Sequence, residues 1–195
     1  MTINLDLLDE ESATEAIKAV AEIAEENGVG WALVGGLAMA LYGSDRNTKD
    51  IDIIGEKFLP LQNRGLLKQG GERYFVNTNK EKVAVDWIVR NDEFKSLFQE
   101  ALKDAVEIDD VPILTPEWLV VLKFIAGRFK DQEDAVFLLS RNNLVNRKLI
   151  KEHIIETAGE IAWELAKLGL QRWFDLADGR TREEERNEKE GYIDS

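Results

Sequence analysis

Two aspartates one residue apart, Asp50 and Asp52, have the spacing in this chain that most directly suggests chemistry. Side chains alternate between the two faces of an extended strand, so both carboxylates share one face while Ile51 and Ile53 share the other. Two like charges this close repel each other unless a cation lies between them. Carboxylate oxygens suit a hard divalent ion such as Mg²⁺, which can also carry a phosphate. The spacing therefore predicts a metal site.

A glycine pair, Gly35-Gly36, precedes the aspartates and predicts an anion site. Residues 33–34 are typical of a buried strand, and residues 37–41 are typical of a helix. A glycine turn that enters a helix leaves backbone N–H groups unpaired, and these groups can hold an anion. A phosphate cradle facing a metal site is the minimum apparatus for chemistry on a nucleoside triphosphate.

Together these residues resemble the nucleotidyltransferase superfamily, whose signature is a Gly-Gly or Gly-Ser turn followed by an Asp-x-Asp strand. The AbiEii-like toxin nucleotidyltransferases are the most similar branch. In that branch an Arg-x-Thr often precedes the aspartates, as Arg46 and Thr48 do here. A Lys-Asp-x-x-Asp run also recurs in a later helix, matching Lys130, Asp131 and Asp134.

The superfamily needs a third carboxylate on a neighbouring strand, and Asp86 is the candidate. It lies inside an apolar, β-branched run at residues 83–90. An isolated ionised aspartate there would cost several kcal/mol in desolvation unless it were paired or metal-bound. The alternative is that Asp86 lies at a solvated strand end or pairs with a nearby arginine. The upstream motif favours the metal-site interpretation.

The resemblance implies a reaction and a set of roles. An acceptor hydroxyl attacks the α-phosphate of a nucleotide and pyrophosphate leaves, with Mg²⁺ or Mn²⁺ as cofactor. The catalytic and metal-binding residues are expected to be Asp50, Asp52 and Asp86. The nucleotide-binding residues are expected to be Gly35, Gly36, Arg46, Thr48, Lys123 and Lys130. The family often has serine at the second glycine; Gly36 lacks that hydroxyl, so the phosphate grip is expected to rest on the backbone.

Lys123 and Lys130 are seven residues apart and share a helix face if the helix continues through Gly127. One or both are expected to contact the triphosphate; the alternative is that they are ordinary solvated lysines. Asp131 and Asp134 are expected to orient Lys130 or to pair with Arg46. The single histidine, residue 153, is expected to lie on the surface.

The leading functional hypothesis is a magnesium-dependent nucleotidyltransferase that is the toxin of a toxin–antitoxin pair. Its partners would be an NTP substrate, a transfer RNA or protein acceptor, and an antitoxin protein. One alternative is a catalytically inactive nucleotide-binding or protein-interaction module of the same fold. Another is transfer onto a small molecule such as an antibiotic. A phosphatase with Asp50 as nucleophile is disfavoured, because the glycine turn would then have no role.

Composition narrows the class of protein. The chain has 195 residues, a net charge of −13 and no cysteine. This length can bury one sizeable core, and the lack of cysteine excludes disulfides and thiolate metal sites. The net charge argues against a broad nucleic-acid groove. Residues 1–29 carry −7, whereas residues 123–151 carry +4, so a local basic face is expected on the C-terminal helical part.

The sequence also predicts where the chain resides. No segment reaches the roughly 18 apolar residues that a membrane helix needs. The N-terminus lacks a basic stretch followed by a continuous apolar run. We therefore expect a cytoplasmic protein with no membrane partner.

The secondary-structure elements that must position these residues are expected to form an α/β (α+β) fold. This fold is a small mixed sheet flanked by helices and followed by a C-terminal helical bundle. Besides the strand before Gly35, strands are expected at residues 50–55, 72–77 and 83–90, and residues 106–114 are expected to form one more strand or a hairpin that bends at Asp109-Asp110. Helices are expected at residues 9–27, 92–103, 130–139, 146–158 and 161–176, with a further helix starting at Thr115-Pro116. The predicted divisions are an α/β core with its N-terminal helix (1–114), a helical subdomain (115–177) and a charged, flexible tail (178–195).

Overall fold

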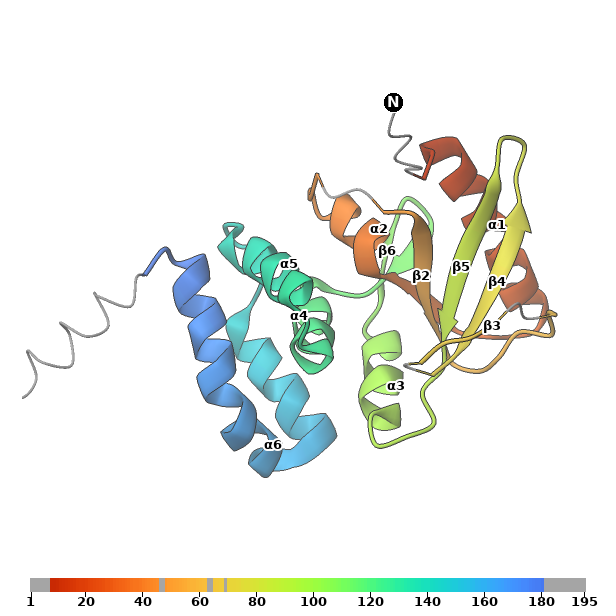
Figure 1. The fold of residues 1–195 in the computed structure, drawn as a ribbon. Helices are drawn as coiled ribbons and strands as arrows, with labels where there is room; N and C mark the ends of the chain where they lie inside the picture. Colours follow the sequence, from red (N-terminus) through yellow and green to blue (C-terminus); the bar gives the residue numbers. More distant parts are fainter. Residues whose placement is uncertain (1–7, 46–47, 63–64, 69, 181–195) are drawn as a thin grey trace, which may run out of the picture. The chain divides into compact units, whose positions relative to one another are not determined.

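The computed structural model describes residues 8–45, 48–62, 65–68 and 70–180. The chain divides into two compact units, residues 1–115 and 116–195. The first contains a mixed β-sheet with helices packed against it, and the second is helical (Figure 1). The expected fold class is therefore confirmed.

In the described part of the first unit, the sheet has seven strands in the order β3-β4-β5-β2-β1-β7-β6. Their bounds are Trp31–Val34 (β1), Asp50–Gly55 (β2), Gly65–Leu66 (β3), Glu72–Asn77 (β4), Lys82–Ile88 (β5), Val106–Ile108 (β6) and Val111–Ile113 (β7). β2 runs parallel to β5 and β1 runs parallel to β7, while the other neighbours are antiparallel. The helices of this unit are Glu10–Glu26 (α1), Gly35–Leu41 (α2) and Lys95–Lys103 (α3).

One face of the central strands forms the core of the sheet. Ile51 and Ile53 of β2 are completely buried, and their register partners on β5, Val85 and Trp87, are buried as well. Burying each of these side chains contributes about 1.5–3 kcal/mol. The aspartates of β2 alternate with the isoleucines, so the same strand that anchors the core presents carboxylates on its other face.

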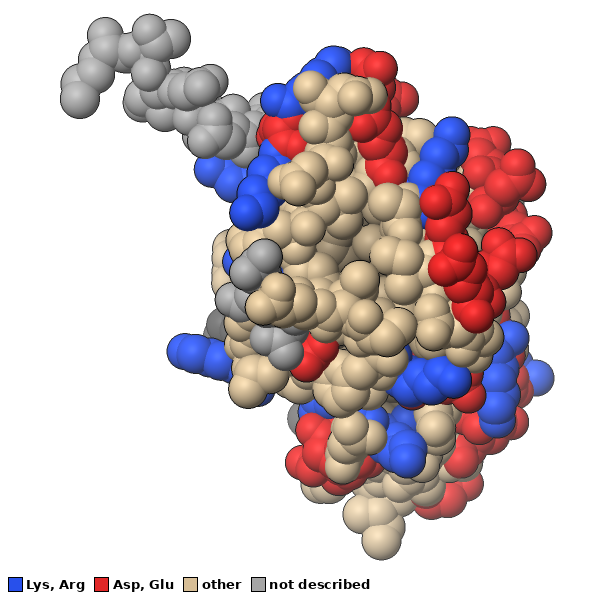
Figure 2. Space-filling model, turned by 90° about the vertical axis from the view of Figure 1, so that its right-hand side faces the viewer, with Lys and Arg blue, Asp and Glu red and all other residues tan. Residues whose placement is uncertain are grey.

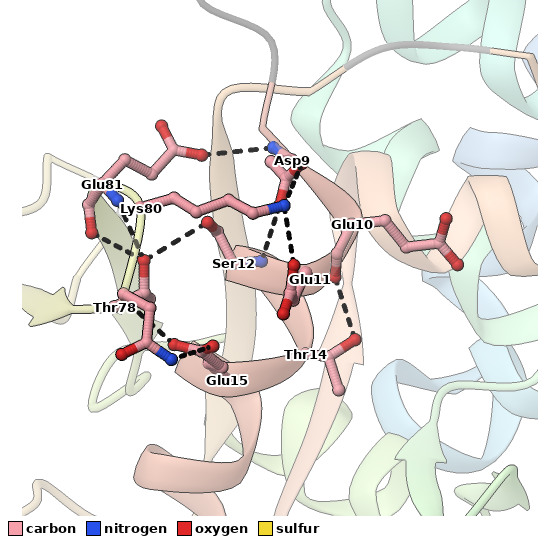
Figure 3. Close-up of polar contacts among 10 residues, drawn as sticks. Asp9, Glu10, Glu11, Ser12, Thr14, Glu15, Thr78, Lys80 and Glu81 are labelled. Carbon is pink, nitrogen blue, oxygen red and sulfur yellow. Dashed lines mark hydrogen bonds and ion pairs between the residues drawn. The ribbon is translucent and has the colours of Figure 1, made fainter.

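The first helix is tied to the turn between β4 and β5 by charged contacts (Figure 3). Lys80 in that turn lies 3.0 Å from the carboxylate of Asp9, the N-cap of α1, and 2.7 Å from that of Glu11. Asn79 donates from its backbone and side-chain nitrogens to Glu15 at 2.9 and 2.7 Å. The hydrogen bond from Lys80 holds the pKa of Asp9 below its ordinary value. Because these groups are exposed, the contacts orient the helix more than they stabilise it.

Several elements predicted from the sequence occur at the expected positions. The predicted helix 9–27 is α1 with Asp9 and Asn27 as its caps, and the strands at 50–55 and 72–77 have the predicted bounds. The segment 106–114 is the β6–β7 hairpin. Asp109 and Asp110 form its turn with φ angles of 50° and 63°. The two-residue β3 was not predicted, because so short an edge strand carries no periodicity.

The second unit contains the helices Pro116–Ala126 (α4), Phe129–Ser140 (α5) and Arg147–Ala177 (α6). α4 begins at Pro116, as the Thr115-Pro116 signal predicts. A separate second helix was predicted at 130–139, and α4 does end before it, so the helix does not continue through Gly127. Gly127 has a φ of 64°, and its N–H donates to the carbonyl of Lys123 at 3.0 Å, so it ends the helix.

α6 is two helical arms joined at a kink (Figure 1). The kink lies at Gly159, with φ 85° and ψ 169°, so the arms correspond to the helices predicted at 146–158 and 161–176. The kink lets the two ends of α6 meet: Arg147 donates to Asp178 from both terminal nitrogens, at 2.9 and 2.5 Å. Asp178, predicted to begin a flexible tail, is therefore held by the helix. The rest of the predicted tail, from residue 181, lies outside the described residues.

Aromatic side chains form much of the core of the second unit. The ring of Trp118 stacks on His153 with centroids 4.1 Å apart, and Phe124 meets the edge of Trp173 at 5.1 Å. A Cβ atom at Gly169 would lie 2.9 Å from the Phe124 ring, so the small residue lets α6 approach α4 closely. His153 was expected on the surface; it is half-buried because Trp118 covers it.

The surface carries the acidic excess of the sequence. Figure 2 shows one face on which acidic side chains gather, with basic side chains interspersed. The first turn of α1 begins with Glu10 and Glu11. Among the described residues, no helix combines the length and the apolar character needed to cross a membrane.

Candidate active site

Three carboxylates lie on one face of the sheet, opposite its core. Arg73 of β4, Asp86 of β5, Asp52 of β2 and Val34 of β1 are successive register partners across four neighbouring strands. Residues paired in register point to the same face, and Asp50 shares that face because it lies two residues before Asp52. The fold thus brings Asp50, Asp52 and Asp86 together immediately before the Gly35 turn.

Arg73 holds two of these carboxylates. Its Nε donates to Asp86 Oδ1 at 2.5 Å, and its Nη2 donates to Asp86 Oδ2 at 2.7 Å and to Asp50 Oδ2 at 3.4 Å. The hydrogen bonds to Asp86 raise the pKa of Arg73 above its ordinary value. The Asp86 side chain is 7% exposed, so a paired cation offsets the cost of burying its charge. The structure therefore shows the alternative arrangement, in which Asp86 pairs with a nearby arginine.

The glycine turn lies against the third carboxylate. Gly35 has a φ of 64°, and a Cβ atom built on it would come within 2.0 Å of Asp52 Oδ2. The turn therefore requires glycine both for its backbone conformation and for its approach to Asp52. A phosphate seated on this turn would lie beside the Asp52 carboxylate, so the predicted anion cradle requires a cation between the two anions.

Thr48 lies beside the second glycine. A Cβ atom at Gly36 would lie 2.8 Å from Thr48 Cβ and 2.9 Å from its Oγ1. The hydroxyl donates to the carbonyl of Asp50 at 2.9 Å. The Thr48 hydroxyl therefore reaches the space into which a side chain at position 36 would project. Arg46, the other residue of the predicted Arg-x-Thr motif, lies outside the described residues.

The remaining predicted site residues belong to the second unit. Lys123 is 7% exposed, and its Nζ donates to the buried Asp134 at 2.5 Å. Asp131 accepts from the side chain of Arg128 at 2.6 and 3.0 Å. Asp134 thus pairs with Lys123, and Asp131 pairs with Arg128. Both acids were expected to orient Lys130 or to pair with Arg46; Arg46 lies outside the described residues, so that pairing stays a prediction.

The two lysines differ in environment. Lys123 is a buried, paired lysine, so the alternative of an ordinary solvated lysine is wrong for it. Lys130 is exposed, in the first turn of α5. The helix end at Gly127 places the two on separate helices, so the condition under which they would share one helix face is not met.

The three carboxylates are chemically suited to a divalent ion, but their present arrangement is less suited to one. Carboxylates from two adjacent strands are the oxygen ligands that Mg²⁺ and Mn²⁺ take. Within the described ranges, no group of three or more histidine, cysteine, aspartate or glutamate side chains is arranged to hold a metal ion. The cation that two of these carboxylates, Asp50 and Asp86, do contact is the guanidinium of Arg73.

Arg73 is the residue that sequence reasoning missed by name. Its strand was predicted, yet the pairing of β4 with β5 decides which face Arg73 takes and which residue it meets. Proximity in the sequence gave no signal, because 23 positions separate Arg73 from Asp50. The available hint was a basic residue within the predicted strand at 72–77, which lies beside β5.

Comparisons with known proteins give similarities of fold. No protein-family model matches the sequence. No curated protein matches it significantly. One similar solved structure is an antigenic nucleotidyltransferase-like protein from Paracoccidioides brasiliensis, with a TM-score of 0.46 and 15% identity, covering 80% of this chain and 93% of that one. Another is a candidate nucleotidyltransferase from H. pylori, with a TM-score of 0.48 and 15% identity, covering 81% of this chain and 83% of that one.

Proposed function

We propose that this protein is a Mg²⁺- or Mn²⁺-dependent nucleotidyltransferase that moves a nucleoside monophosphate from an NTP to an acceptor hydroxyl. One observation carries the proposal: Asp50, Asp52 and Asp86 share a sheet face that ends at the glycine turn with which α2 begins. Such a face combines acceptor groups for a cation with backbone donors for a phosphate.

Each residue has a role in this reaction. Asp50, Asp52 and Asp86 hold the divalent ion, which when bound neutralises the negative charge of the phosphates. The backbone N–H groups at Gly35 and Gly36 meet the outer phosphates. The new bond joins the acceptor oxygen to the α-phosphorus, and the bond from that phosphorus to the bridging oxygen breaks. The acceptor proton passes to Asp86, and pyrophosphate leaves.

The acceptor is a transfer RNA or a protein, and the protein acts as the toxin of a toxin–antitoxin pair. Lys130, which is exposed in the first turn of α5, supports contact with a polyanionic acceptor. A small-molecule acceptor such as an antibiotic would use the same chemistry. The sequence excess of acidic residues elsewhere favours a limited contact with nucleic acid over a broad groove.

Labelled nucleotides test the proposal. The protein is incubated with each α-³²P-labelled NTP, Mg²⁺ or Mn²⁺, and cell extract, and labelled acceptors are separated. Wild-type protein should label an acceptor, and Asp50→Asn and Asp52→Asn should abolish the label. Asp109→Asn is the matched control, because this exposed acid lies in the β6–β7 turn, where asparagine tolerates the positive φ. Equal labelling by wild type and Asp50→Asn would show that the assignment is wrong.

The pairing of Arg73 with Asp86 favours a second candidate function. A module that keeps the fold and binds nucleotide or protein without turnover could use Arg73 as a permanent counter-ion for Asp50 and Asp86. Calorimetry distinguishes the two. Nucleotide binding with no transfer to RNA, protein or small-molecule acceptors would favour the module.

A further inference from the structure

The guanidinium of Arg73 occupies the point at which Asp50 and Asp86 converge. It contacts both oxygens of Asp86 and one oxygen of Asp50. The side chain is 39% exposed, whereas that of Asp86 is 7% exposed. The arginine can therefore leave toward solvent, while the carboxylate that it holds stays within the sheet.

A divalent ion and this guanidinium cannot hold Asp86 in the same way at the same time. The arginine engages both oxygens of Asp86 and one of Asp50, so an ion shared by these two carboxylates would need the space that the guanidinium fills. Without either cation, a buried carboxylate would lie beside two others of the same charge. The site therefore needs one positive group, and the chain carries its own.

We propose that Arg73 is a positioning residue that exchanges with the divalent ion: it holds Asp50 and Asp86 in the metal-free protein and is displaced when the ion binds. This inference rests on the proposed function in that it takes these carboxylates as metal ligands. Metal binds the molecules in which Arg73 has left the carboxylates, so the apparent metal affinity is the intrinsic affinity multiplied by that unpaired fraction. The exchange also protects Asp86 from being left as a buried, unpaired charge.

Titration calorimetry with Mn²⁺ alone, without nucleotide, tests the exchange. If nine molecules in ten are paired, Arg73→Gln should bind Mn²⁺ about tenfold more tightly than wild type. Arg73→Lys, which keeps the charge but makes no two-pronged contact, should fall between them. Arg90→Gln is the matched control, because Arg90 pairs with Asp92 elsewhere in the first unit, and its Mn²⁺ affinity should equal that of wild type.

Thermal unfolding gives a second readout. In EDTA, Arg73→Gln should melt at a lower temperature than wild type, because the three carboxylates lose their cation. Saturating Mn²⁺ should raise the melting temperature of Arg73→Gln more than that of wild type. A merely structural salt bridge would give the first effect without the second.

If Arg73→Gln does not fold, the inference can still be tested on the wild-type protein. The Nε–H resonance of Arg73, identified by its loss in Arg73→Lys, should shift as Mg²⁺ is added, because its bond to Asp86 breaks. The inference is overturned if this resonance does not move under Mg²⁺ saturation. It is also overturned if wild type and Arg73→Gln bind Mn²⁺ equally, or if neither binds it. Tighter Mn²⁺ binding by Arg73→Gln together with no nucleotidyl transfer by wild type would instead overturn the proposed function alone.

Discussion

A Cβ atom built on Gly35 would lie 2.0 Å from Oδ2 of Asp52, so the glycine turn and the aspartate strand fit together only because position 35 has no side chain. The contact joins the two halves of the sequence motif, which are 17 positions apart. It also predicts that position 35 is more sensitive than other glycines with the same backbone conformation.

Gly35→Ala should reduce the free energy of unfolding by about 2–4 kcal/mol. About 1–2 kcal/mol comes from the left-handed φ of 64°, and the rest from displacing Asp52. Gly28→Ala is the control, since Gly28 has a φ of 57° and nothing within 4 Å of its Cβ position. Urea unfolding measures both. Equal losses for the two variants would show that the contact with Asp52 has no energetic consequence.

Gly36 and Thr48 should show energetic coupling. Gly36→Ala places a Cβ atom 2.8 Å from that of Thr48 and should cost about 1–3 kcal/mol. The same substitution in a Thr48→Gly background should cost almost nothing, because the colliding atom is gone. A double-mutant cycle by urea unfolding should therefore give a coupling of about 1–3 kcal/mol, equal to the cost in wild type. Additive effects would contradict the close approach.

The Lys123–Asp134 pair should dominate the electrostatics of the second unit. Lys123→Met should destabilise the protein by about 3–5 kcal/mol, since it leaves Asp134 buried without its lysine. Lys123→Met with Asp134→Leu should recover much of that loss. Lys130→Met, on the exposed face of α5, should change stability by less than about 0.5 kcal/mol. Thermal unfolding of the three variants checks this, and a small effect of Lys123→Met alone would refute it.

Asp131 should make the second unit sensitive to acid. Burial by itself raises the pKa of Asp131, but the hydrogen bonds from Arg128 outweigh it and hold the pKa below the ordinary 3.8. The carboxylate also accepts the Arg128 backbone N–H at the start of α5, a cap contact that contributes about 1 kcal/mol.

A lowered folded pKa means that this stabilisation is present above pH 3.8 and is lost as the pH falls through the folded value. Asp131→Asn should therefore be less stable than wild type at pH 6, and the difference should shrink steadily below pH 3.8. Urea unfolding between pH 2.5 and about 7 measures it. A difference that stays constant across this range would contradict the ion pair with Arg128.

Local patterns in the sequence determined the elements and part of the site. Strand alternation alone places Asp50 and Asp52 on one face, and the cap residues Asp9 and Pro116 mark helix starts that the structure confirms. These features depend on residues close in sequence, whose backbone geometry fixes where the side chains point. The sequence left open whether the helix continues through Gly127, because a glycine inside a helical pattern is compatible with either outcome until its φ is known.

Tertiary structure alone decided which side chains contact one another. Arg73 reaches Asp86 because β4 pairs with β5 in one particular register, and a slip of one residue would turn Arg73 to the opposite face. Thr48 reaches Gly36, and Lys123 reaches Asp134, through packing of segments that the sequence does not align. The sequence thus determined that Asp50 and Asp52 share a strand face, and the pairing of distant strands decided that Asp86 joins them and that an arginine holds two of the three carboxylates.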